Sequence, residues 1–172
     1  MKARNMALCA LFAALLAVCA WIAVPIGDIT FTLQTFGVFL TLGLLGGKRG
    51  TVAILVYLLL GAAGLPVFSG FRGGIGALLG VTGGYLVGFL FTGLVYWIFT
   101  ACKVPQLPAM GLGLLACYTF GTLWFRFGYL QGGDPAGLGI VLLKCVVPYL
   151  LPDGLKLALA LLLTRKLKRF VY

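Results

Sequence analysis

Two residues that could do chemistry stand three positions apart near the C-terminal end of the chain. Asp153 and Lys156 lie in the segment PDGLK, inside an otherwise apolar stretch. This spacing places both side chains on one face of a helix, and an acid in the first turn suits the positive helix end. Ionisable groups in apolar segments usually face the protein interior and mark substrate paths. We therefore interpret the two residues as a polar pair facing a binding cavity, with a purely local ion pair as the alternative.

Further candidates lie in the glycine-rich segment 69–84, which is apolar apart from Arg72. A guanidinium donates well to carboxylate or carbonyl oxygens, and the neighbouring glycines let backbone approach a ligand. The alternative is an arginine that reaches outer lipid headgroups. A helix begins at the end of this segment, and the unpaired backbone N–H groups of its first turn could face a ligand. The residues of this turn are Thr82, Gly83, Gly84 and Tyr85.

The remaining polar residues give weaker signals. Gln34, in TFTLQTF, is either a ligand contact or an amide that joins two helices. Asp134 followed by Pro135 is typical of a helix start, and Arg126 and Lys144 are typical of interfacial or pairing residues. The charges near the candidate cavity are net positive, which favours an anionic ligand that also carries N–H groups.

The composition requires a membrane around these residues. Of the 172 residues, 62% are hydrophobic and 9% are charged, whereas a soluble domain is about a quarter charged. Spans of about 20 residues leave room for six. The chain has no His, and its three acidic residues are all Asp, which disfavours an enzyme with a histidine base or paired carboxylates. We also expect no metal, no cofactor and no nucleic-acid partner, and we interpret the cysteines as buried thiols.

The apolar runs predict an all-α integral membrane protein, a single domain over residues 1–172 with six transmembrane helices and glycine-rich outer loops. An extended piece is expected at 29–32 and irregular backbone over 69–84. Nine of the 13 basic residues then fall on the side that holds both chain ends, which predicts cytoplasmic termini. The six spans are expected at 6–25, 33–45, 51–67, 85–102, 109–125 and 152–167.

Small residues recur along the first predicted helix. Ala10 and Ala14 form one pair four residues apart, and Ala13 and Ala17 form another. Such pairs let a second helix approach closely. The stripe either contacts a partner protein or packs within the chain itself.

Five motifs in this order resemble the BioY family, the biotin-specific S components of energy-coupling-factor (ECF) vitamin transporters. The likeness covers nearly the whole chain, although the fifth span adds little to it. The motifs are TLQTFGV at 32–38, LLGGKRG at 44–50, GLPVFSGFRGG at 64–74, TGGYLVGF at 82–89 and VPYLLPDGLKLALA at 147–160.

The resemblance implies a six-helix protein that binds biotin from the outside and works with a transmembrane coupling protein and two ATPase subunits. It implies that Asp153, Lys156, Arg72 and the Thr82–Tyr85 turn surround biotin, and that the alanine face meets the coupling protein. The chain has no Gly-x-x-x-x-Gly-Lys-Ser/Thr motif, so energy must come from a partner, or transport must be facilitated. The alternatives are an S component for another small anionic vitamin and a facilitated biotin transporter acting alone.

Overall fold

The structure is a computed structural model that describes residues 3–26, 29–131, 142–143 and 146–171. The helix start expected at Asp134 and the pairing role expected for Lys144 lie outside the described residues. Within that part of the chain, five helices are long and apolar enough to cross a membrane. They are α1 (Ala3–Trp21), α2 (Gln34–Ala62), α4 (Gly83–Ala101), α5 (Gln106–Gln131) and α7 (Val147–Val171).

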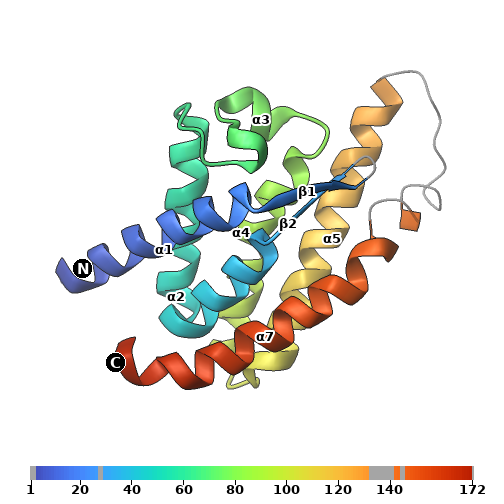
Figure 1. Ribbon diagram of the computed structural model, residues 1–172. Helices are drawn as coiled ribbons and strands as arrows, with labels where there is room; N and C mark the ends of the chain where they lie inside the picture. The colour runs from blue at the N-terminus through green and yellow to red at the C-terminus, as the bar shows by residue number, and fades with distance from the viewer. Residues whose placement is uncertain (1–2, 27–28, 132–141, 144–145, 172) are drawn as a thin grey trace.

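Helix α2 is two helices joined at Gly46. This residue has φ 76° and ψ 172°, a conformation open essentially only to glycine. The two halves turn back on one another, as Figure 1 shows, and a Cβ at Gly50 would lie 3.0 Å from the Cα of Leu42. The described residues therefore contain six long helical segments, as predicted, but the loop expected over 46–50 shrinks to a single residue.

A two-stranded hairpin follows α1. Strand β1 (Ala23–Ile26) pairs antiparallel with β2 (Ile29–Thr32), with Ala23 opposite Thr32. The extended piece at 29–32 is thus confirmed, whereas the helix expected to reach Pro25 ends at Trp21. The reason is local, because proline disfavours helical backbone at the residue before it, here Val24.

The glycine-rich segment after α2 is more regular than expected. It contains a short 3-10 helix, η1 (Ser69–Phe71), and a five-residue helix, α3 (Ile75–Leu79). Phe71 takes a left-handed φ of 56°, and its ring stacks on Trp21 with the centroids 5.1 Å apart. The Trp21 indole N–H also donates to the carbonyl of Pro66 at 2.9 Å. These contacts fasten the segment to the end of α1.

Helix α7 begins earlier than predicted, so Pro152 lies inside it. Pro148 is the second residue of the helix, where a backbone N–H has no helical acceptor in any case. Asp153 is the seventh residue, and its expected place in the first helical turn is therefore wrong. The positive end of the helix dipole therefore does not stabilise the Asp153 carboxylate. Contacts with other parts of the protein stabilise it instead.

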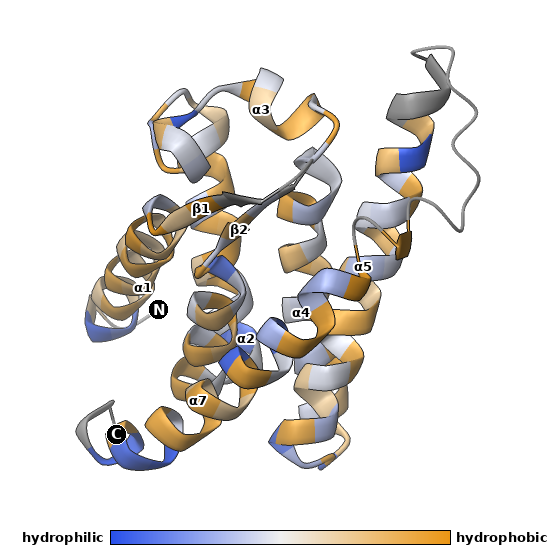
Figure 2. Ribbon diagram, turned by 45° about the vertical axis from the view of Figure 1, so that its right-hand side comes forward, coloured by the Kyte–Doolittle hydropathy of each residue, from blue (hydrophilic) through white to orange (hydrophobic). Residues whose placement is uncertain are grey.

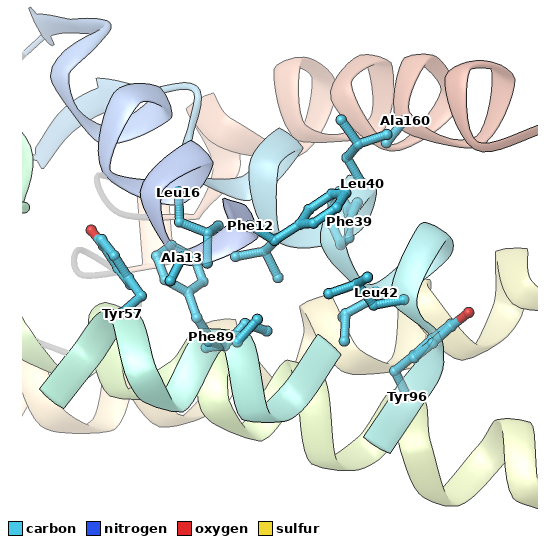
Figure 3. Close-up of a cluster of buried hydrophobic side chains, with 14 of the residues drawn as sticks. Phe12, Ala13, Leu16, Phe39, Leu40, Leu42, Tyr57, Phe89, Tyr96 and Ala160 are labelled. Carbon is cyan, nitrogen blue, oxygen red and sulfur yellow. The ribbon is translucent and has the colours of Figure 1, made fainter. Parts of the chain in front are cut away.

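The helices approach closely at glycines. A Cβ at Gly88 would lie 2.7 Å from the Cys117 sulfur, and one at Gly113 would lie 2.9 Å from the Thr92 carbonyl. Both contacts join α4 to α5. Figure 3 shows the core, where side chains of α1, α2 and α7, including Phe12, Phe39 and Ala160, meet. Many apolar side chains on the outer helix faces remain exposed, and Figure 2 shows hydrophilic residues at helix ends, as expected for helices in lipid.

Candidate functional site

A cavity of about 400 Å³ lies among β2, α2, α3, α4, α5 and α7. Its apolar side includes Phe68, Leu86 and Phe89, and its volume is within the range of small-molecule pockets. The polar groups come from strand β2, the first turns of α2 and α4, the η1 segment, α5 and α7. The polar and charged lining residues are Thr30, Thr32, Gln34, Thr35, Ser69, Arg72, Thr82, Tyr85, Tyr118, Tyr149, Asp153 and Lys156.

Asp153 stands at the centre of the polar side of the cavity and is only 3% exposed. Its Oδ1 accepts hydrogen bonds from the Thr35 hydroxyl and from the Lys156 ammonium, both at 2.8 Å. Its Oδ2 accepts from the Tyr118 hydroxyl at 2.6 Å. The carboxylate is therefore held by donors from three helices, which keep its negative charge stabilised away from water.

Lys156 completes this arrangement from the next turn of α7. Its Nζ donates to the Thr32 carbonyl at 2.7 Å, the Thr35 hydroxyl at 3.0 Å and Asp153. The same nitrogen lies 3.9 Å from the centre of the Phe31 ring, a cation–π contact. All three ammonium hydrogens thus have acceptors in this structure, and the expected pair on one face of the helix is present.

Gln34 lines the cavity but is already engaged with its neighbours. Its Oε1 accepts from the Thr32 hydroxyl at 3.1 Å, and its Nε2 donates to the Tyr57 hydroxyl at 2.7 Å. Tyr57 donates in turn to the carbonyl of Val67 at 3.1 Å. Through these bonds Gln34 connects β2 to the segment that carries Arg72. This is the linking role that was the alternative to a ligand contact, and Gln34 also borders the cavity.

Arg72 lies on the exposed side of the cavity. Its Nε donates to the Ser69 carbonyl at 3.1 Å, which aligns the side chain along η1. Thr82 and Tyr85 also line the cavity, and the Tyr85 hydroxyl lies 3.3 Å from that of Thr122. These three predicted residues reach the same space as Asp153 and Lys156.

Gly83 and Gly84 are not among the residues that line the cavity, so the structure gives no support to their expected role as ligand contacts. A Cβ at Gly83 would collide with the Leu78 backbone, and one at Gly84 would collide with the Trp124 side chain. The two glycines therefore let α4 pack against α3 and α5. Their effect on the site is indirect, because this packing sets where Thr82 and Tyr85 stand.

The alanine stripe of α1 divides between two environments. Ala13 and Ala17 are 2% and 6% exposed and belong to the core, whereas Ala10 and Ala14 are exposed. The expectation of a partner contact through Ala13 and Ala17 is therefore wrong for the structure described. Only the Ala10/Ala14 pair remains open to another protein.

Two side chains that hold Asp153 were missed by the sequence reasoning. Thr35 lay inside the motif TLQTFGV, but nothing in its surroundings distinguished it from a helix-capping or packing threonine. Tyr118 sits in the fifth span, an apolar run in which a lone tyrosine carries no pattern. Only the tertiary structure, in which α5 and α7 both border the cavity, shows that its hydroxyl reaches Asp153.

A cavity with a buried ion pair and a cation on its exposed side, set among apolar membrane-length helices, defines a membrane protein that binds a small polar solute. The BioY family model matches residues 1–172, and the chain belongs to the BioY family. This family consists of transport proteins, so the chain is a transport component and not an enzyme.

Known relatives agree with this assignment. The chain is 40% identical over 169 residues to a probable biotin transporter BioY of Pyrococcus horikoshii, covering 98% of each chain. It is 39% identical over 169 residues to the biotin transporter BioY of Thermotoga maritima, covering 96% of each. The fold matches a crystal structure of the S-component for biotin from an ECF-type ABC transporter with a TM-score of 0.85 and 27% identity, covering 98% of this chain and 92% of that one.

The mutual dependence of the two buried charges can be tested by stability. We expect Lys156→Met to lower the melting temperature of the ligand-free protein in detergent, because Asp153 loses its counter-ion, at a cost of about 3–5 kcal/mol. The double variant Asp153→Asn/Lys156→Met, which removes both charges, should recover much of this loss. A single variant as stable as the unsubstituted protein would show that Asp153 needs no counter-ion.

Proposed function

We propose that this protein captures biotin at the outer face of the membrane and passes it to the cytoplasm as the S component of an ECF transporter. The observation that carries the proposal is the buried Asp153–Lys156 pair facing a cavity in a chain of the BioY family. Biotin offers a ureido ring with two N–H donors and a carbonyl, an apolar thiophane ring and an anionic valerate chain. The cavity presents an acceptor, apolar walls and a cation that suit these parts.

Asp153 is the acceptor for a ureido N–H in this proposal. Its carboxylate is buried and ionic, so a bond from a neutral N–H donor is charge-assisted and stronger than a neutral pair. Phe68, Leu86 and Phe89 line the cavity and suit the thiophane ring, whose burial is favourable in apolar surroundings.

Arg72 is the better partner for the valerate carboxylate. Lys156 already gives its three hydrogens to Thr32, Thr35 and Asp153. Arg72 lies on the exposed side of the cavity, and the hydrogen bond described for it uses only its Nε. Its terminal N–H groups match a carboxylate in a two-point geometry.

This orientation can be tested with biotin and biotinamide, which lacks the carboxylate charge. Asp153→Asn should weaken both ligands by a similar factor, about ten- to a hundredfold, because both keep the ureido ring. Arg72→Gln should weaken biotin by about tenfold or more and change biotinamide by less than about threefold. Affinities measured by calorimetry in detergent decide this.

The reverse pattern, in which Asp153→Asn spares biotinamide, would place Asp153 near the carboxylate and contradict the orientation. A panel of other anionic vitamins on the unsubstituted protein addresses the alternative S component. Uptake into vesicles that contain this chain alone addresses the alternative of facilitated biotin transport without a partner.

We further propose that both termini are cytoplasmic. The C-terminal end of α7 carries Arg165, Lys166, Lys168 and Arg169, and basic residues prefer the cytoplasmic side. Figure 1 places this end, the α2 bend and the α4–α5 connection at the lower end of the molecule, away from α3. Lys48 and Lys103 belong to that same end.

The native Cys102, exposed at the end of α4, reports on this topology. A membrane-impermeant maleimide added to intact cells should leave Cys102 unlabelled, and the same reagent should label it in inside-out vesicles. Cys102→Ser removes the signal and serves as the control for the other cysteines. Labelling of Cys102 from outside intact cells would mean the opposite topology.

We also propose that a transmembrane coupling protein and two ATPase subunits energise transport, and that the coupling protein packs on the Ala10/Ala14 pair. These two alanines form an exposed small-residue notch on α1, suited to close helix contact. The neighbouring pair, Ala13 and Ala17, is buried in the core and contributes only to the position of α1.

Ala14→Trp fills this notch and should leave biotin affinity unchanged within about twofold, because α1 does not line the cavity. Co-purification with the coupling protein should fall strongly. The matched control is Leu115→Trp, which adds a similar ring at a residue of α5 that is 57% exposed. Equal recovery of the partner with both variants would mean that α1 is not the contact surface.

A further inference from the structure

We propose that Tyr118 is a positioning residue that leaves the Asp153 carboxylate a single open position for a ligand N–H. The inference rests on the proposed function, since it concerns the acceptor assigned there to the ureido ring. The observation is the 2.6 Å bond from the Tyr118 hydroxyl to Oδ2, on the oxygen that Lys156 and Thr35 do not use.

The acceptor capacity of the carboxylate sets this limit. Each carboxylate oxygen accepts about two hydrogen bonds. Among the described residues, Oδ1 already accepts from Thr35 and Lys156, and Oδ2 accepts from Tyr118 alone. One position on Oδ2 therefore stays open, and the Tyr118 hydroxyl excludes the ligand from the other.

The Tyr118 ring is held firmly enough to direct this oxygen. Tyr118 is 8% exposed, and its neighbour Cys117 packs against Gly88 of α4 and donates to the Tyr85 carbonyl at 3.6 Å. These two contacts fix the backbone of α5 against α4 next to Tyr118. Rotation of the Asp153 carboxylate would break the bonds from Tyr118 and Thr35 together.

The consequence is that the Asp153 carboxylate selects ligands with a single N–H donor directed at its Oδ2 atom. A carboxylate held at both oxygens cannot turn to form the paired, two-point contact that a guanidinium or amidinium ligand would need. A neutral ring with a single N–H directed at Oδ2 satisfies the open position. Pre-orientation also lowers the entropic cost of binding, because the acceptor does not have to be ordered by the ligand.

The test uses the infrared carboxylate band of Asp153 together with biotin affinity. The chain has only three acidic side chains, so the Asp153 band can be assigned by subtracting the spectrum of Asp153→Asn. In the ligand-free protein, Tyr118→Phe should shift this band, since it removes a short charge-assisted bond. Biotin affinity should fall about tenfold in the native background and by less than about twofold in the Asp153→Asn background.

Two controls separate positioning from loss of stability. Thr122→Val removes another buried hydroxyl one turn further along α5, which contacts Tyr85 and not Asp153, and it should leave the Asp153 band in place. Incorporation of 3-fluorotyrosine at position 118 keeps the ring and strengthens the donor, so the band should shift in the direction opposite to Tyr118→Phe. This second measurement holds even if the Phe variant does not fold.

An unshifted band in both Tyr118 variants, or an equal loss of affinity in both Asp153 backgrounds, would overturn the proposal. Failure of the unsubstituted protein to bind biotin would instead refute the proposed function. The ligand-free infrared comparison does not depend on that result, so the two failures can be told apart.

Discussion

A buried ion pair in a membrane protein is stable only if its neighbours replace the water that it has lost, and the Asp153–Lys156 pair imposes this demand here. Its 2.8 Å contact is surrounded by the Thr32 carbonyl and the Thr35 and Tyr118 hydroxyls. Desolvation of two charges is costly, and the additional hydrogen bonds offset it. Strand β2 and helices α2, α5 and α7 must therefore meet at one point, and the cavity lies at that point.

Close helix packing is what makes this meeting possible. Glycines at the contacts of α4 with α5 and of α2 with α4 remove side chains where the backbones come together, as at Gly88 and Gly93. In lipid, packing and interhelical hydrogen bonds hold helices together, since apolar side chains gain little by leaving lipid tails. Thr92 shows both features, because its hydroxyl donates to the Gly113 carbonyl at 3.0 Å across the α4–α5 contact.

A chain of hydrogen bonds extends from the ion pair to the segment between α2 and α3 that carries Arg72. Lys156 donates to the Thr32 carbonyl, the Thr32 side chain contacts Gln34, and Gln34 reaches Val67 through Tyr57. Phe68, next to Val67, seats its ring against Gly61. The segment that carries Arg72 is thus anchored to the same network as Asp153, so the backbone that bears the cation is connected to the acceptor through hydrogen bonds.

The sequence alone determined the membrane environment, the number of long helical segments and the pairing of Asp153 with Lys156. These depend on composition and on spacing within one helix, which are local properties. The BioY motifs also pointed to Arg72, Thr82 and Tyr85, which the structure brings to the cavity. Element limits were less accurate where a single residue decided them, as at Gly46.

Only the tertiary structure decided which polar side chains meet. Tyr118 and Thr35 approach Asp153 from positions 35 and 118 residues away in the chain, and no periodic pattern marks such contacts. The same holds for Gly83 and Gly84, whose role in packing depends on Leu78 and Trp124, and for the alanine stripe, whose division depends on where α2 lies. The physical reason is that burial and hydrogen bonding between helices are set by packing in three dimensions, whereas sequence spacing fixes only the face of one helix.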